Sequence, residues 1–154
     1  MKLIGRKYER QLTYHMFKGD IDDTKHYVGL QEADAEVTED SAPQKNLPFV
    51  APFTGKLLKI FLRASSDLSA KTYTWTLETL NTSQTSYSAP NIIGTQSGAG
   101  CSASNMATYD FTYSLDSGTN VIGAGDMVHL AVECNTTTPN VTYGITCLWE
   151  WNLS

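Results

Sequence analysis

Residues 141–151 read Val-Thr-Tyr-Gly-Ile-Thr-Cys-Leu-Trp-Glu-Trp, and this stretch decides the fold class. A large apolar or sulfur-bearing side chain stands at every second position, with Thr, Gly, Leu or Glu between. Successive side chains of a β-strand point to opposite faces, so the alternation predicts a strand with one face toward a core. Trp149 and Trp151 fall on that inward face. We interpret them as core residues rather than as a sugar-stacking or interface pair.

The same two-residue period recurs in residues 56–65, 71–80, 109–115 and 128–134. Residues 8–17 and 26–31 are two weaker candidates, which brings the total to about seven or eight strands, the number a jelly roll uses. No segment keeps a helical 3.6-residue period over more than two turns. The sequence therefore predicts an all-β protein, an antiparallel two-sheet β-sandwich of jelly-roll type with an extended N-terminal arm.

Segments rich in Gly, Pro, Asp and Ser separate these strands. Residues 52–55 read as a turn that launches the next strand, and residues 123–126 read as a second turn of this kind. The connection 81–107 is too long for a hairpin, and we expect a loop with one short strand at Ile92 and Ile93. The glycine-rich residues 94–100 are expected to form a flexible loop.

Length and charge exclude several classes of protein. The 154 residues, 16.9 kDa in mass, suffice for one domain, or one domain with an arm. The net charge of −5 makes nucleic acid an unexpected partner, since phosphate binding needs a surplus of Lys and Arg. The chain has no run of about eighteen apolar residues and no apolar stretch after its basic start, so we expect no membrane partner, no secretory signal and synthesis in a cytosol.

Charge also divides the chain along its length. Residues 1–18 hold five basic residues and one acidic residue, a net charge of +4, whereas residues 19–40 hold eight acidic residues and one basic residue, a net charge of −7. Apolar residues interleave with the basic ones, so we expect the first segment to dock on a partner. We place an attachment arm, which contributes one or two strands at most, at 1–46 and the jelly-roll body at 47–154. We expect the body to fold without the arm.

The placement of Cys and His argues against catalysis and metal binding. The three cysteines have no C-x-x-C spacing. Cys134 and Cys147 share the inward parity of their strands, Cys101 lies in the long connection, and we expect all three to be free thiols. His129 has the outward parity and is expected to face solvent. Since no phosphate loop, nucleophile elbow or metal-ligand spacing occurs, we expect no enzyme, no cofactor and no metal site.

Two motifs carry a resemblance to a known group of proteins. Residues 52–63 read PFTGKLLKIFLR, and residues 123–132 read GAGDMVHLAV, each a turn followed by a strand. Together with the aromatic last strand, residues 47–154 resemble the small jelly-roll domains of tailed-bacteriophage structural proteins, notably capsid decoration (cement) proteins, head fibres and tail-fibre modules. The resemblance implies a virion location, no catalysis and frequent trimers.

The function that we expect is capsid decoration. The protein would be made in the host cytoplasm and would lie on the outer capsid surface as a homotrimer, bound to the major capsid protein. Covering sheet edges and aromatic side chains such as Phe61 also favours oligomerisation. The candidate capsid contacts are Arg6, Lys7, Tyr8, Arg10, Leu12, Tyr14 and Phe17.

Two alternatives remain open. One is a head-fibre or tail-fibre module that binds host surface glycans, and the other is a carbohydrate-binding module unrelated to viruses. Both place the function in the long connection and in exposed aromatic side chains. Their candidate ligand residues are Tyr87, Gln96 and Asn105.

Overall fold

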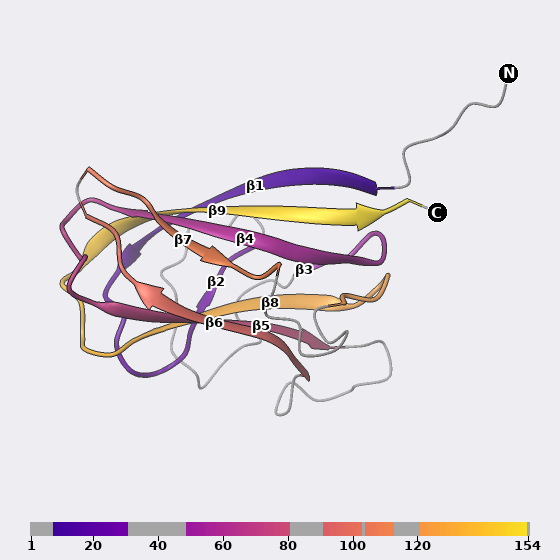
Figure 1. Cartoon of the computed structure of the whole chain (residues 1–154). Helices are drawn as coiled ribbons and strands as arrows, with labels where there is room; N and C mark the ends of the chain where they lie inside the picture. Colours follow the sequence, from indigo (N-terminus) through magenta and orange to yellow (C-terminus); the bar gives the residue numbers. More distant parts are fainter. Residues whose placement is uncertain (1–7, 31–48, 81–90, 103, 113–120, 154) are drawn as a thin grey trace, which may run out of the picture.

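The computed structural model describes residues 8–30, 49–80, 91–102, 104–112 and 121–153. Their strands form two layers, the upper and lower halves of Figure 1. The first sheet consists of β1 (Tyr8–Gly19), β9 (Val141–Asn152), β4 (Gly55–Ala64) and β7 (Ala107–Asp110). The second consists of β2 (His26–Val28), β8 (Met127–Cys134), β5 (Thr72–Leu80) and β6 (Asn91–Ala99), with the short β3 (Phe49–Val50) paired to β8. These residues contain no helix.

The strand pairing identifies the fold as a jelly roll. The sheet orders are β1-β9-β4-β7 and β2-β8-β5-β6, and every pair is antiparallel. The first strand therefore pairs with the last, β2 with β8, β4 with β7, and β5 with β6. This nested pairing is that of an antiparallel ribbon rolled into a two-sheet sandwich. The predicted fold class is confirmed.

The first segment of the chain is part of this sandwich. All 12 residues of β1 pair with β9, from Tyr8 opposite Asn152 to Gly19 opposite Val141, and β2 pairs with β8. The two strands expected in the first 46 residues thus lie in opposite sheets, one strand in each. Residue 47 is therefore not the border between an arm and a separately folded body, because β1 is the edge strand of the first sheet and pairs with the last strand, β9.

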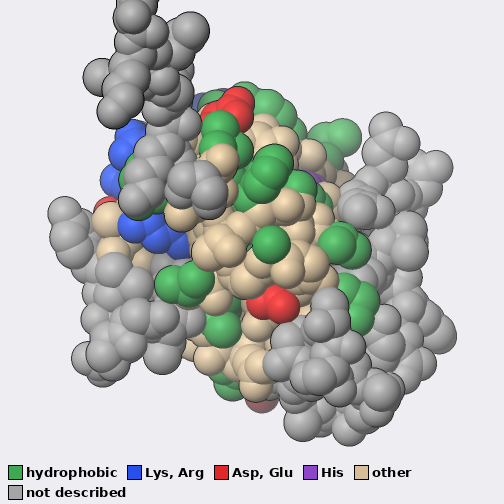
Figure 2. Space-filling model, turned by 90° about the vertical axis from the view of Figure 1, so that its right-hand side faces the viewer, with side chains coloured by type: hydrophobic (Ala, Val, Ile, Leu, Met, Phe, Trp, Pro, Cys, Tyr) green, Lys and Arg blue, Asp and Glu red, His purple; other side chains and the backbone are tan. Residues whose placement is uncertain are grey.

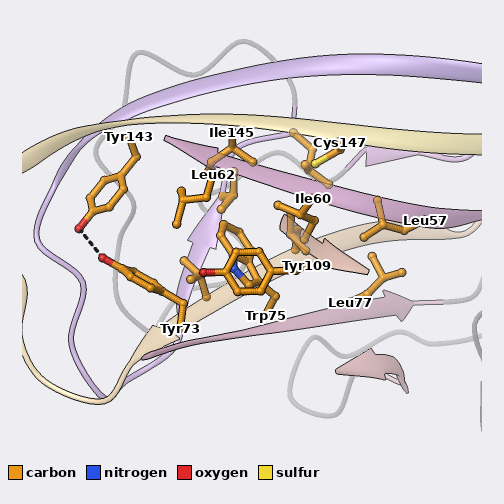
Figure 3. Packing of buried hydrophobic residues seen from close by; sticks show 14 of the residues in the cluster. Leu57, Ile60, Leu62, Tyr73, Trp75, Leu77, Tyr109, Tyr143, Ile145 and Cys147 are labelled. Atoms are coloured by element: carbon orange, nitrogen blue, oxygen red, sulfur yellow. Dashed lines mark hydrogen bonds between the residues drawn. The ribbon is translucent and has the colours of Figure 1, made fainter. Parts of the chain in front are cut away.

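The core fills the space between the sheets with large aromatic side chains. Trp75, Tyr73 and Tyr109 are buried with Leu62 and Ile60, as Figure 3 shows, and the Tyr73 and Tyr143 hydroxyls lie 3.4 Å apart. Burying side chains of this size is the main source of stability in a sandwich of two sheets.

The terminal tryptophans belong to the same core, as predicted. Trp149 and Trp151 are buried and stack on each other with ring centroids 5.7 Å apart. Each buried indole N–H still needs an acceptor. The Trp149 Nε1 donates to Thr13 Oγ1 at 2.9 Å, and the Trp151 Nε1 donates to Gln11 Oε1 at 2.8 Å. Both acceptors come from β1, which ties the first strand to the last by side chains as well as by backbone.

The two turn motifs lie against each other. The Gly55 and Ile122 backbones exchange hydrogen bonds of 2.9 and 2.8 Å. The Ala51 N–H donates to the Asp126 carbonyl at 2.9 Å, and the Ala51 carbonyl accepts from the Gly125 N–H at 2.8 Å. Gly125 has a φ of 87°, a conformation that other residues adopt only with strain. The predicted turn before β4 and the one before β8 are therefore confirmed, and they form one joint structure.

The long connection contains more strand than expected. Asn91–Ala99 form β6, which pairs with β5 as the second arm of a hairpin. The strand expected at Ile92 and Ile93 is present, but it continues to Ala99. The glycine-rich residues 94–99 lie in this strand and not in a flexible loop. Gly and Ser lack the apolar alternation that marks a strand, and backbone pairing along β5 holds them in place instead.

All three cysteines are buried. Cys134 and Cys147 enter the core from β8 and β9, as their parity predicts, and Cys101 is also buried although it lies between strands. Burial raises the pKa of the Cys101 thiol, and it raises the pKa of the Cys147 thiol to about 12. Because the reactive form of cysteine is the thiolate, burial slows the reaction of Cys101 and Cys147 in two ways: it blocks access to the sulfur and it keeps the thiol protonated.

The rate of thiol alkylation should therefore differ between the native and the unfolded protein. With a pKa of about 12, about one Cys147 thiol in 10,000 is ionised at pH 8. We expect iodoacetamide to label the native protein at least about tenfold more slowly than the urea-unfolded protein, in which mass spectrometry without reductant should count three labels. Fast labelling of the native chain, or fewer than three labels after unfolding, would contradict this prediction.

Candidate functional site

The outward face of the first sheet exposes an unusual number of apolar side chains. On β1, the residues that point away from the core include Leu12, Tyr14 and Met16, and the last two are 72% and 75% exposed. Phe61 on β4 and Met106 just before β7 continue this face across the sheet. We call it the outer apolar face. Adjacent exposed apolar side chains are typical of an interaction surface, whereas isolated ones are not.

A groove lies in the middle of the outer apolar face. The register places Met16, Gly144 and Arg63 side by side on β1, β9 and β4, and the neighbouring row is Tyr14, Thr146 and Phe61. Met106 closes the groove beyond Arg63, and the volume is about 320 Å³. Gly144 forms its floor because it is the position on this face of β9 without a side chain.

The outer apolar face is positively charged although the chain is acidic. Five basic and two acidic side chains point outward from these strands, an excess of three positive charges on a chain with a net charge of −5. They are Arg10, Lys18, Lys56, Lys59 and Arg63 against Asp110 and Glu150. Figure 2 views the sandwich from the end at which β9 finishes, and Lys and Arg side chains gather along one side of that view.

The two acidic side chains are already engaged. Glu150 lies 3.3 Å from Arg10 and 3.5 Å from Lys56, and Asp110 lies 3.3 Å from Lys59. Hydrogen bonds from Thr112 and the ion pair with Lys59 lower the pKa of Asp110. Neither Lys18 nor Arg63 has a carboxylate within ion-pair distance among the described residues. Arg63 lines the groove, and Lys18 is the next outward residue of β1 beyond Met16, so both cations lie near an acidic partner bound there.

The second sheet carries a different feature, a polar cluster on its outward side. Glu78 is fully buried, its Oε1 lies 2.5 Å from Lys25 Nζ, and its Oε2 accepts a hydrogen bond from the Tyr27 hydroxyl at 3.3 Å. His129 faces Glu78 across the β5–β8 pairing. A buried carboxylate with a cation and a hydroxyl donor is a satisfied structural pair.

The expected exposure of His129 is wrong. Its side chain is buried, and the Tyr27 ring packs edge-on against it with centroids 5.8 Å apart. Burial lowers the pKa of His129, and the nearby Glu78 carboxylate partly offsets that effect. Outward parity failed as a guide because neighbouring side chains of the same face, among them Tyr27 from β2, pack against His129.

The structure brings most of the candidate capsid contacts together. Tyr8, Arg10, Leu12 and Tyr14 follow one another on the outward side of β1 and are exposed. Phe17 is a correction, because it has the opposite parity and is buried against Tyr143, with stacked rings 4.8 Å apart. Arg6 and Lys7 lie outside the described residues.

The candidate glycan residues are not brought together. Gln96 lies half-buried on β6 opposite Trp75. Asn105 is exposed in a turn before β7, where its backbone N–H donates to Ser102 Oγ at 3.0 Å. Tyr87 lies outside the described residues. Gln96 and Asn105 therefore belong to separate elements, one a sheet edge and the other a turn.

Sequence reasoning missed the groove. Gly144, Arg63, Met16 and Met106 had no assigned role, and Phe61 was noted only as an aromatic that oligomerisation would cover. One signal was present, since Gly144 is a glycine at an outward position of an otherwise regular strand. Such a glycine marks a close approach by another group or a local irregularity, and register alone shows which residues surround it.

The described residues contain neither a metal-binding cluster nor a membrane-spanning helix. No group of three or more His, Cys, Asp or Glu side chains is arranged to hold a metal ion. No helix in this part of the chain is long and apolar enough to cross a membrane.

Comparison with known proteins finds matches among solved structures. No protein-family model matches the chain, and no curated protein matches it. Among solved structures, the structure of Eiger TNF from S. frugiperda matches with 13% sequence identity and a TM-score of 0.38, covering 91% of this chain and 94% of that one. The jelly-roll assignment rests on the strand order of the chain itself.

Proposed function

We propose that this protein is a capsid decoration protein of a tailed bacteriophage, which binds the major capsid protein on the outer surface of the head. The observation that carries the proposal is the outer apolar face, a wide, exposed and positively charged surface on a sheet. The resemblance of residues 52–63 and 123–132 to phage jelly-roll domains supplies the phage context. A homotrimer made in the host cytoplasm belongs to the proposal through that resemblance.

The geometry suits binding rather than catalysis. A paired sheet holds its backbone in place, so a partner that binds here does not have to order a loop. Tyr, Met and Arg are residue types enriched at protein interfaces. Tyr14 and Met16 are successive outward residues of β1, and Arg63 lies across Gly144 from Met16. The apolar side chains supply affinity, and the basic ones orient the partner.

The edge of the first sheet offers a second means of attachment. β1 ends the strand order of its sheet, so β9 is its single strand partner within the described residues. A long edge strand can accept one more strand from another protein through backbone hydrogen bonds. An attachment of this kind would resist salt, whereas contacts through Arg10 or Lys18 would weaken with it.

The alternative is a fibre module that binds host glycans. The observation in its favour is that Tyr14 and Phe61 place two aromatic rings in one row of the outer apolar face. Labelling of particles decides between the readings. An antibody against the protein should label the whole head of purified particles if it is a decoration protein, the fibres if it is a fibre module, and no particle if it is a free carbohydrate-binding module.

Removal of one exposed ring should weaken attachment. Tyr14→Ala deletes a side chain that is 72% exposed, so we expect an unchanged fold and at least tenfold weaker binding to particles, a typical loss for a central aromatic contact. Ile92→Ala is the matched control, because Ile92 is an exposed apolar residue of the second sheet. If Tyr14→Ala binds particles as tightly as Ile92→Ala, the attachment surface lies elsewhere on the protein.

A further inference from the structure

Gly144 is unexplained by the packing of this chain. A glycine inside a strand costs about 0.5–1 kcal/mol relative to alanine, so it persists where something requires it. A Cβ at Gly144 would meet no atom within 4 Å, and Gly125 is the glycine with a positive φ in the described chain. The β1–β9 register passes through Gly144 without a shift. Among the described residues, no contact, backbone conformation or bulge calls for a glycine here.

The space above Gly144 has the size and lining of a small binding site. Its volume of about 320 Å³ is at the lower end of the ~300–1,000 Å³ typical of ligand pockets. Met16 and Met106 are flexible thioethers that adapt to the shape of an inserted group. Tyr14 and Phe61 add aromatic walls. An apolar side chain of leucine or phenylalanine size is the natural occupant.

We propose that this groove receives a large apolar side chain from an acidic segment of the partner protein, with its flanking carboxylates paired to Arg63 and Lys18. This inference rests on the proposed function and deepens it by giving the chemistry of the partner. The acidic groups of this face, Glu150 and Asp110, already pair with Arg10, Lys56 and Lys59. The positive charge near the groove is therefore matched by acidic groups of the partner.

Other occupants fit less well. A sugar needs several polar groups at the site, and around this groove the outward side chains besides Arg63 are mainly apolar. A basic segment would meet Arg63 and Lys18, two cations without an ion-pair partner among the described residues. A second copy of the chain remains a distinct case, and the oligomeric state of a groove variant tests it.

The decisive variant is Gly144→Leu. The Cβ has open space, so the variant should fold with an unchanged or higher melting temperature, while its side chain fills the groove. We expect binding to particles to fall at least tenfold. Thr95→Leu is the matched control, since it adds the same side chain at an exposed position of β6 in the other sheet. Arg63→Gln should also weaken binding and reduce its dependence on salt.

A peptide experiment tests the groove without particles. The methyl NMR signals of Met16 and Met106 are followed while acetyl-Asp-Phe-Glu-amide or acetyl-Lys-Phe-Lys-amide is added. The acidic peptide should shift both signals, the basic peptide should shift neither, and Gly144→Leu should abolish the response. Equal effects of the two peptides, or no response to either, would overturn the inference whatever the particles show.

The outcomes separate the two proposals. If the parent protein binds heads and Gly144→Leu binds equally well, the groove inference fails and capsid decoration stands. If the parent binds no head but the acidic peptide occupies the groove, capsid decoration fails and the groove stands. If Gly144→Leu dissociates an oligomer that the parent forms in light scattering, the occupant is a second copy, and the acidic-partner inference fails.

Discussion

A chain that begins at Leu47 should fail to fold. The truncation removes β1 and β2, and with them the buried side chains of Phe17, Ile21, Val28 and Leu30. Loss of one such side chain costs about 3 kcal/mol, so the loss of all four costs ~12 kcal/mol. That is as large as the whole free energy of unfolding of a typical domain. We expect no cooperative thermal transition by circular dichroism and no near-ultraviolet signal from packed aromatics. This replaces the expectation that the body folds without its first 46 residues.

The reason lies in what β1 covers. Without it, β9 becomes an exposed edge along its whole length, and the indoles of Trp149 and Trp151 lose the acceptors on Thr13 and Gln11. The control is a chain that lacks residues 1–7, which keeps every described strand and should melt cooperatively. A cooperative transition in the chain from Leu47 would contradict this prediction, since it would show that the remaining strands of both sheets suffice.

Gly55→Val should destabilise the protein by about 3 kcal/mol, at the upper end of the range for overpacked sites. A Cβ at Gly55 would overlap the ring of Trp151 and come within 2.6 Å of the Glu150 carbonyl oxygen, which is backbone and cannot turn aside. The variant would also press on the Gly55–Ile122 hydrogen bonds that join the two turn motifs. For a chain of this length the melting temperature should fall by roughly 6–12 °C.

Gly144→Ala is the matched control for this prediction. It makes a similar change in the strand that pairs with β4, but into open space, so the variant should be as stable as the parent or about 0.5–1 kcal/mol more stable. Urea unfolding followed by tryptophan fluorescence measures both variants. If Gly55→Val unfolds at the same urea concentration as the parent, the close approach of Trp151 to β4 does not hold in solution.

The candidate site was only partly readable from the sequence. The docking role of the first segment led to Tyr8, Arg10, Leu12 and Tyr14, which do share one exposed face. Phe17 was included wrongly because β1 has apolar residues on both faces, so alternation could not assign it. Its burial depends on Tyr143, a residue more than a hundred positions away in the chain.

The sequence by itself determined the features that depend on local period and local turns. Alternation in residues 141–151 set the inward face of the last strand, because a pleated strand repeats every two residues. The glycines of residues 52–55 and 123–126 set the turns before β4 and β8. Which strands become neighbours is a property of the whole chain. Only tertiary structure therefore made β1 the partner of β9, buried His129 on a central strand, and surrounded Gly144 with Met16 and Arg63.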